Sequence, residues 1–424
     1  MSAPKPFLSR SIVSMVDQVL LSGLNFAIGI ALIRYASKET YGLYSQLFAA
    51  GVLSTTLLDA LIGSALTTLS ARRSADERVM LVARTLRIQW IASALLAVIA
   101  GVGIGVLSAT VGLSENSLGL AFSFAAFIFA LGSREYCRTA LFIESRPEIV
   151  AKLDAIFVAV TLFGAVLLLL VDHVTVTEIM CLLAAANGVV AVLYSADLVK
   201  TKGSVVAWRH YVTDFQLLWS LSRWALVGSI AGWLVNNSYL YVAGGLLGVA
   251  ALADLNAARL LLIPISILSV AWSRVARPTL GQLIAATEWD SIRRFLLKST
   301  LAMEAFTVVY VAALWLAFPW LSAYVLGEKY QHISHLLLLW GVYFAINSAR
   351  NIGTTLLTSF GAFKALFWQG LASLPVLLIA CWVLMPRFGV IGALGAMIAV
   401  ETWELLVNWA YLLPRARQQQ LALE

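Results

Sequence analysis

The sequence predicts an all-α membrane protein, with twelve transmembrane helices in two six-helix bundles around a central cavity. Apolar residues make up 61% of the 424 residues and charged residues only 12%. A soluble domain of this composition would lack the polar side chains needed to cover its surface. Apolar runs of about 20 residues or more, the length of a membrane-spanning helix, recur along the whole chain. The turns between them are short and leave no room for a soluble domain.

Twelve apolar runs predict the membrane-spanning helices. They lie at residues 13–34, 42–70, 83–107, 118–142, 150–171, 175–199, 215–242, 251–275, 294–318, 333–358, 362–384 and 388–413. The run at 42–70 is longer than a bilayer requires, so this helix is expected to tilt or to extend beyond the membrane. Six runs precede residue 212 and six follow it, which predicts bundles of residues 1–212 and 213–424. Two such halves around a site at the middle of the bilayer are typical of transporters built from two repeats.

The lysine and arginine residues predict which side of the membrane each loop faces. Three of the 29 lie within spans, and four, Arg34, Lys38, Lys329 and Arg387, lie on one side. The remaining 22 lie in loops and flanks on the other side, together with both termini. Because basic loops remain in the cytoplasm, both termini are predicted to be cytoplasmic. This topology explains the formal net charge of +7 without a nucleic-acid partner.

Arg259 is the strongest functional signal, because a charge inside a membrane span is costly and usually serves a function. It lies well inside the run at 251–275, one turn after Asn256 on the same helical face. A guanidinium pairs with phosphate oxygens through two hydrogen bonds and stays charged. We therefore expect Arg259 and Asn256 to bind an anionic substrate. The alternative is an internal ion pair of Arg259 with Asp254 or another acid.

Two further spans carry an arginine together with an asparagine. Arg350 lies one turn after Asn347 in the run at 333–358, and this polar stripe predicts either a cavity wall or hydrogen bonds between helices. Arg223 lies in the run at 215–242, which also contains Asn236. The long side chain of Arg223 can reach the lipid headgroups, so binding and anchoring are both open. We include all four residues in the predicted substrate-binding set.

Three acidic residues within or beside the spans are candidates for coupling transport to an ion gradient. They are Glu304, Glu401 and Asp254. Carboxylates inside spans often carry a proton or another ion. Each of them can instead balance an arginine or an asparagine inside the bundle.

No motif predicts catalysis or a bound cofactor. The four histidines have no Cys or His partner at metal-ligand spacing apart from His332 and His335, which share a loop. The sequence has no GxxxxGK[ST] loop for ATP phosphates and no nucleophile elbow. We therefore predict a protein that is not an enzyme, with no catalytic residues, no metal and no cofactor.

Three motifs, in their order along the chain, carry a resemblance to a known family. They are residues 32–35 (LIRY) with 39–44 (ETYGLY), residues 325–330 (VLGEKY), and residues 384–393 (LMPRFGVIGA). With these motifs the chain resembles the Wzx-type lipid-linked oligosaccharide flippases. These form the polysaccharide-transport branch of the multidrug/oligosaccharidyl-lipid/polysaccharide (MOP) superfamily. The resemblance covers nearly the whole chain and implies two helical bundles in a V, alternating access and a cationic cavity.

The resemblance also implies the function. The expected protein is a multi-pass flippase of the bacterial inner membrane that moves an undecaprenyl-pyrophosphate-linked oligosaccharide, for surface or exopolysaccharide assembly. Its expected partners are this lipid-linked substrate, membrane lipids, and the polysaccharide polymerase and export machinery. One alternative is a drug or metabolite exporter of the same superfamily, which would favour an acidic cavity. Another is a membrane polysaccharide polymerase or ligase, which usually needs a large outer loop that this chain lacks.

Overall fold

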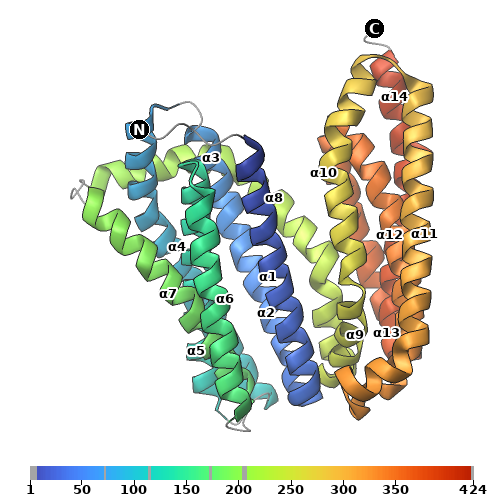
Figure 1. Ribbon diagram of the computed structural model, residues 1–424, viewed down its shortest axis with the longest axis horizontal. Helices are drawn as coiled ribbons and strands as arrows, with labels where there is room; N and C mark the ends of the chain where they lie inside the picture. Colours follow the sequence, from blue (N-terminus) through green and yellow to red (C-terminus); the bar gives the residue numbers. More distant parts are fainter. Residues whose placement is uncertain (1–6, 71–72, 113–115, 171–173, 203–207, 422–424) are drawn as a thin grey trace. The chain divides into compact units, whose positions relative to one another are not determined.

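The apolar runs fold into helices in the computed structural model (Figure 1), which describes residues 7–70, 73–112, 116–170, 174–202 and 208–421. Every regular element in these ranges is a helix, which confirms the all-α prediction. The helices form two compact units. The first comprises the described residues up to Ala36 and from Gln46 to Ile230, and the second comprises Ser37–Ser45 and the chain from Ala231 onwards. The predicted domains 1–212 and 213–424 stay a prediction.

The first unit is built around α5, which packs against both α4 and α7. Buried Tyr136, Cys137 and Leu141 on α5 belong to its main apolar core. The helices that contribute to this unit are α1 (Phe7–Tyr35), α2 (Lys38–Leu58), the π-helical η1 (Asp59–Gly63), α3 (Ser64–Ser70), α4 (Ala75–Val111), α5 (Ser117–Ile143), α6 (Pro147–Leu170), α7 (Val176–Lys202) and the first part of α8 (Trp208–Leu247).

The second unit is built around α12, which packs against α10, α11 and α13. Its apolar core includes Leu280, Ile352 and Leu357, of which the first and last are fully buried. The helices that contribute to this unit are the start of α2, the second part of α8 from Ala231, α9 (Val249–Leu261), α10 (Ile263–Ala285), α11 (Trp289–Leu321), the π-helical η2 (Ser322–Leu326), the 3-10 helix η3 (Glu328–Ile333), α12 (Ser334–Ser359), α13 (Phe363–Leu406), the π-helical η4 (Val407–Leu412) and α14 (Leu413–Leu421).

The predicted span at 251–275 is a pair of helices rather than one straight helix. α9 and α10 meet at an angle of 53°, and Leu262 between them has φ −100° and ψ 1°. Pro264 follows in the first turn of α10 and has no amide hydrogen to continue the α9 ladder. The bend therefore places Arg259 in the last turn of α9.

The last two predicted spans correspond to the two legs of α13. Gly389 has φ 57° and ψ −130°, a conformation outside the helical region, and separates residues 363–388 from 390–406. Gly392 packs so closely on the preceding leg that a Cβ atom there would lie 2.1 Å from the Leu384 carbonyl oxygen. Only a residue without a side chain fits this turn, which agrees with the predicted break between residues 384 and 388.

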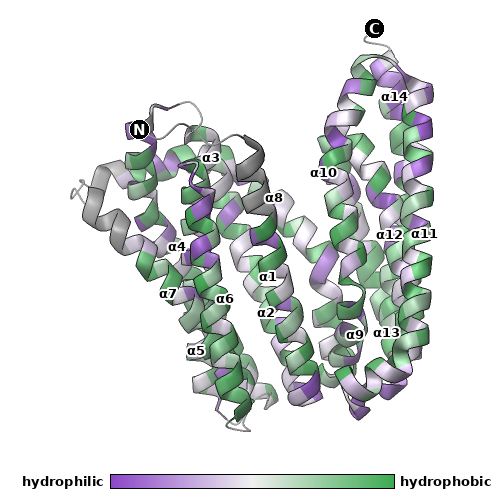
Figure 2. Cartoon of the chain, in the orientation of Figure 1, coloured by the Kyte–Doolittle hydropathy of each residue, from purple (hydrophilic) through white to green (hydrophobic). Residues whose placement is uncertain are grey.

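Apolar side chains on the helix surfaces are consistent with a multi-pass membrane protein. Eight helices of the described chain are long and apolar enough to cross a membrane, or nine if α9 and α10 together count as one span; α8 and α12 are not among the eight. Leu170, Leu316 and Trp382 each expose more than two thirds of their surface. Figure 2 shows hydrophobic residues along most of α6 and α11, as expected for helices that face lipid.

Candidate functional site

Arg259 is held by two buried aromatic residues of the second unit. Its Nη1 donates a hydrogen bond of 2.9 Å to the hydroxyl of Tyr239, and its guanidinium lies 5.6 Å from the ring centroid of Trp340. Both aromatic side chains are fully buried, and Trp340 Nε1 donates to the Leu255 carbonyl at 3.0 Å. No acid of the described chain forms an ion pair with Arg259. The guanidinium is therefore oriented by neutral partners and keeps its charge uncompensated.

Asn256 adds a second donor one turn before Arg259 on α9. Its Nδ2 atom is buried and has no hydrogen-bond partner among the described residues. A buried amide without a partner costs free energy, commonly about 1–3 kcal/mol, so such a group is a sign of a ligand or of a local defect. The sequence predicts that Arg259 and Asn256 bind one substrate from the same face of the helix, and the positions of both residues on α9 are consistent with this prediction.

Asp254 does not pair with Arg259, so the alternative ion pair considered from the sequence is absent. Asp254 Oδ1 lies 2.6 Å from Lys38 Nζ, and its Oδ2 lies 3.2 Å from His332 Nε2. Lys38 also lies 5.1 Å from the ring centroid of Tyr330. Asp254 therefore connects the start of α2 with the segment between α11 and α12. Its proposed role in ion coupling stays a prediction.

Arg350 differs from Arg259, because it is paired with two carboxylates of α13. Its Nε lies 2.6 Å from Glu401 Oε2 and its Nη1 lies 3.3 Å from Glu404 Oε2. Tyr343 on the same helix donates to Glu401 Oε1 at 3.3 Å. Asn347 accepts a hydrogen bond of 3.1 Å from Asn351. Arg350 therefore bonds to a neighbouring helix, which is the alternative that the sequence left open for this residue. Glu401 is one of the two carboxylates that balance its charge.

The other predicted site residues are Arg223, Asn236 and Glu304. Arg223 is exposed and belongs to the first unit, whereas Asn236 is exposed in the second unit and donates 2.7 Å to the Gly232 carbonyl. Glu304 lies on α11, where its Oε1 is buried and has no hydrogen-bond partner among the described residues. Of the three ion-coupling candidates, Glu304 is therefore the one whose carboxylate is not engaged by a cation of the described chain.

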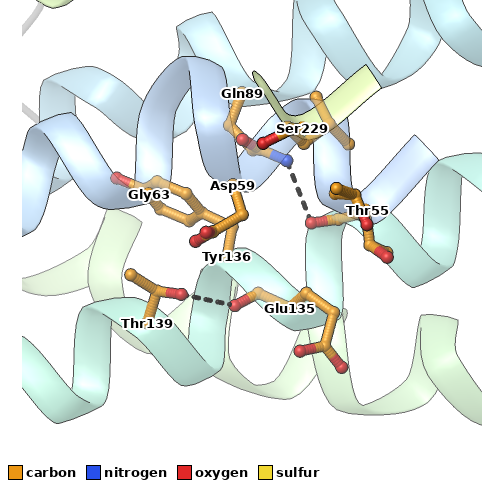
Figure 3. A pocket seen from close by; sticks show the side chains of 11 residues that line it. Thr55, Asp59, Gly63, Gln89, Glu135, Tyr136, Thr139 and Ser229 are labelled. Carbon is orange, nitrogen blue, oxygen red and sulfur yellow. Dashed lines mark hydrogen bonds between the residues drawn. The ribbon is translucent and has the colours of Figure 1, made fainter. Parts of the chain in front are cut away.

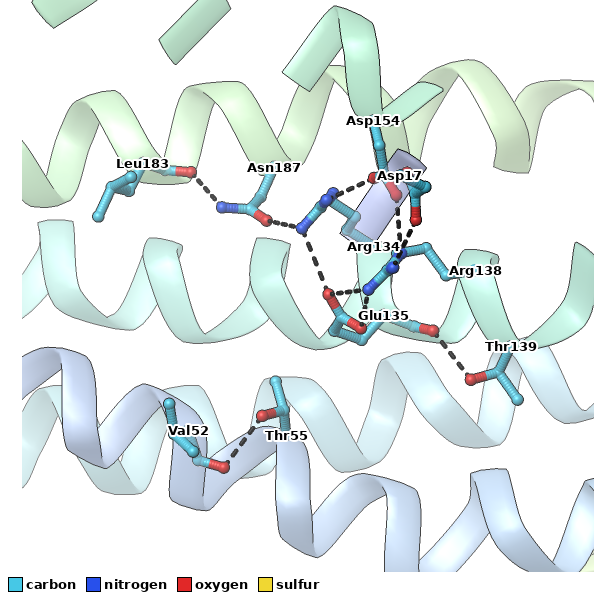
Figure 4. Close-up of polar contacts among 10 residues, drawn as sticks. All are labelled: Asp17, Val52, Thr55, Arg134, Glu135, Arg138, Thr139, Asp154, Leu183 and Asn187. Atoms are coloured by element: carbon cyan, nitrogen blue, oxygen red, sulfur yellow. Dashed lines mark hydrogen bonds and ion pairs between the residues drawn. The ribbon is translucent and has the colours of Figure 1, made fainter. Parts of the chain in front are cut away.

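A buried ion-pair network in the first unit was not predicted as a site (Figure 4). Arg134 Nη2 contacts Asp154, and Arg138 Nε lies 2.9 Å from the second Asp154 oxygen. Arg138 also lies 3.2 Å from Asp17 and 3.0 Å from Glu135. Three carboxylates therefore surround two guanidinium groups, at positions from α1, α5 and α6.

Two members of this network are deeply buried. Arg134 is only 3% exposed, and Asp154 is fully buried. The signal available in the sequence was the spacing of Arg134 and Arg138, which are four residues apart and share one helical face. Asp154, four residues into the run at 150–171, was the acid to expect opposite them.

Glu135 also faces a polar cavity of the first unit, with a volume of about 280 Å³. The cavity is lined by Thr55, Thr56, Leu58, Asp59, Gly63, Gln89, Gly132, Glu135, Tyr136, Thr139 and Ser229. In Figure 3, the Asp59 side chain lies between Gln89 and Thr139. Asp59 starts the π-helical turn η1, a feature that is frequent at functional sites. No lysine or arginine lines this cavity.

The described residues give no indication of a metal site. No group of three or more His, Cys, Asp or Glu side chains in the described chain could hold a metal ion.

Comparison with known proteins places the fold. No protein-family model and no curated protein matches the sequence. The chain is similar to the inward-facing structure of a multidrug resistance transporter of the MATE family in the MOP superfamily, at 13% identity, with 94% of each chain covered and a TM-score of 0.74. It therefore has the fold of the MOP superfamily transporters.

Two further solved structures share this fold. One is the lipid II flippase MurJ in an inward closed conformation, at 11% identity, with 95% of this chain and 86% of MurJ covered and a TM-score of 0.71. The other is a MOP superfamily transporter from Pyrococcus furiosus, described as having a binding pocket of reverse polarity, at 14% identity, with 97% and 95% covered and a TM-score of 0.62. At these identities the likeness concerns the fold.

Proposed function

We propose that the chain is a flippase that moves an oligosaccharide linked to undecaprenyl pyrophosphate across the bacterial inner membrane. Both a drug transporter and a lipid II flippase have the same fold, so the fold is compatible with transport of either kind of substrate. The choice between them depends on the charges that the chain offers to its substrate.

Arg259 is the observation that carries this proposal. It is a membrane arginine held by Tyr239 and Trp340 without a carboxylate partner in the described chain. A guanidinium in this state can pair with a diphosphate in two parallel hydrogen bonds. Asn256 supplies a further unpartnered donor on the same helix. Arg350, Arg223, Asn236 and Asn347 stay predicted contributors to binding.

In the proposed transport cycle, the charged diphosphate determines where the substrate binds. The diphosphate would bind at Arg259, the polyprenyl chain would stay in the bilayer, and the sugar would cross inside the protein by alternating access. Energy would come from an ion gradient or from later consumption of the product. Glu304, Glu401 and Asp254 are the predicted coupling residues, and the unpaired Glu304 oxygen makes it the first to test.

Deletion of the gene tests the proposed function directly. We expect the lipid-linked oligosaccharide to accumulate in the cytoplasmic leaflet of the deletion strain and to return to the normal level when the wild-type chain is supplied on a plasmid. The measurement is extraction of the lipid-linked intermediates, with the leaflet identified by a membrane-impermeant reagent. A deletion strain without accumulation would contradict the flippase proposal.

A second candidate function is export of cationic compounds. Asp59 favours it, because no lysine or arginine lines the cavity that Asp59 faces. If the chain is the flippase, replacing the exposed Asp59 by asparagine should leave transport of the lipid-linked substrate near the wild-type rate. Asp59 lies outside the predicted substrate-binding set, and such a surface substitution changes the free energy of unfolding by only about 0.5 kcal/mol. We also expect efflux of ethidium to be the same in the D59N strain and the wild-type strain. Loss of ethidium efflux in the D59N strain would favour the exporter.

A further inference from the structure

A second cavity lies at one end of the second unit, where α13 begins and α14 follows η4. It has a volume of about 750 Å³. Its polar lining comes from Lys364, Gln369, Arg415 and Gln419, and its aromatic lining comes from Trp368 and Tyr411. No aspartate or glutamate lines it. The cavity therefore presents two cations and two amides, a combination suited to an anion.

Both cations are available to a ligand. Lys364 and Arg415 are exposed, and neither forms an ion pair with an acid in the part of the chain that the structure describes. Arg415 Nη1 donates 2.6 Å to the Tyr411 hydroxyl, and its guanidinium lies 5.7 Å from the centroid of that ring. The aromatic contact orients the guanidinium and leaves its charge uncompensated.

The beginning of α13 adds a third positive element. The chain enters the helix through Gly361, at φ 74°, and the Phe363 amide bonds to the Gly361 carbonyl at 2.8 Å. The next amides, of Lys364 and Ala365, have no hydrogen-bond partner among the described residues. The first turn contains no acid. Free amides and the helix dipole favour an anion at such a helix start.

The inner wall of this cavity is fixed by a buried side chain. Gln369 is 8% exposed, and its Nε2 donates 3.0 Å to the Glu404 carbonyl, just before the π-helical turn η4. That turn contains Tyr411. This hydrogen bond joins the first leg of α13, which contains Lys364, to the leg that continues through η4 to Arg415. The fold therefore sets the spacing between the two cations.

The surroundings of the cavity are those of a membrane interface. Trp368 and Tyr411 are 57% and 56% exposed, and aromatic side chains of this kind collect at headgroup level. The stretch Phe363–Gln420 is apolar enough to cross a membrane. Lys364 and Arg415 belong to the basic loops predicted to be cytoplasmic, and anionic phospholipids concentrate in that leaflet.

We propose that this cavity binds the headgroup of an anionic membrane phospholipid, with Lys364, Arg415 and the first amides of α13 facing its phosphate. Basic pockets between membrane helices on the cytoplasmic side commonly hold such headgroups. The site is separate from Arg259 and does not depend on the transported substrate. A resident lipid there would fasten the start of α13 to α14.

The test uses the purified full chain in detergent micelles, with added dioleoyl phosphatidylglycerol or dioleoyl phosphatidylcholine. We expect native mass spectrometry to show preferential retention of phosphatidylglycerol, with a matching rise in the melting temperature. The double variant K364Q/R415Q should need about 30-fold more of this lipid, since each basic residue near the surface contributes about 1 kcal/mol. The control R274Q/R277Q, which removes two exposed cations of α10, should behave like the wild type.

A further variant separates binding from stability. Ala365→Glu places a carboxylate in the first turn of α13, where it suits the helix dipole but opposes an anionic headgroup. We expect A365E to melt like the lipid-free wild type and to lose the phosphatidylglycerol response, whereas the charge-conserving K364R/R415K variant keeps it. R259A should keep it as well, so this test is independent of the flippase proposal.

Several outcomes would overturn the lipid site. They are equal retention of the two lipids by the wild type, an unchanged response in K364Q/R415Q or A365E, or an equal loss in R274Q/R277Q. Stabilisation by undecaprenyl pyrophosphate but not by phosphatidylglycerol would also overturn it, because the cavity would then hold the carrier lipid instead of a resident phospholipid.

Discussion

Replacing Arg259 with alanine is expected to lower transport of the lipid-linked oligosaccharide about 10–100-fold, because a charge-assisted hydrogen bond contributes about 1.5–3 kcal/mol. The loss should concern substrate binding, since Arg259 has a hydroxyl and a ring as neighbours and no carboxylate in the described chain is left unpaired by its removal. The measurement is the rate at which the cytoplasmic pool of lipid-linked oligosaccharide is depleted in the complemented deletion strain, normalised to the amount of protein in the membrane.

Three further variants serve as comparisons for R259A in this measurement. Arg259→Lys keeps the charge but not the planar fork, so partial transport is expected. Tyr239→Phe keeps the ring and removes the hydroxyl that orients Nη1, so its loss should be smaller than that of R259A. Arg277→Ala removes an exposed arginine of α10 and should transport normally. Full complementation by both R259A and R259K would show that Arg259 does not bind the substrate.

The sequence treats Arg259 and Arg350 alike, and the structure separates them. Each lies inside a predicted span one turn after an asparagine, and nothing local distinguishes the two. The partners of Arg350 are Glu401 and Glu404, which lie 51 and 54 positions further along the chain and meet it through helix packing. Such a pairing depends on tertiary structure, so the sequence could raise it only as an alternative.

The geometry of α9 explains why the nearest acid does not neutralise Arg259. Asp254 precedes Arg259 by five positions, and residues five apart on a helix point in directions about 140° apart, given 3.6 residues per turn. Asp254 therefore turns towards Lys38 and His332. Sequence proximity suggested an ion pair that helical geometry disfavours.

The helices themselves were more predictable than the site, because bilayer thickness dictates the length of apolar runs. Among the described residues, each of the twelve predicted runs overlaps helical structure. The bend between α9 and α10 was missed, although Pro264 was visible, since a proline can also be accommodated in a continuous membrane helix. The network around Asp154 was missed because its members come from three helices and each lay near the end of a predicted span.

Replacing Asp154 with alanine is expected to give the largest loss of stability in the chain. The carboxylate is fully buried and contacts both Arg134 and Arg138. Its removal takes one acid from the buried Arg134 and one from the partly buried Arg138, and breaking a buried pair in this way costs about 3–5 kcal/mol. Asp154→Asn keeps the shape and one acceptor, so it should lose less. The measurement is the free energy of unfolding by SDS in mixed micelles, followed by tryptophan fluorescence.

Glu144→Gln is the matched control for Asp154→Ala, since it neutralises an ion pair of the same unit at the protein surface. Glu144 lies 3.2 Å from Arg146, and the side chains are 13% and 47% exposed, respectively. Because the arginine reaches solvent, such a pair contributes about 0–1 kcal/mol. A double-mutant cycle of Asp154→Ala with Arg134→Ala should show a coupling of about 0.5–3 kcal/mol. If D154A is no less stable than E144Q, the two arginines do not depend on Asp154, and the network cannot be what holds α5 against α6.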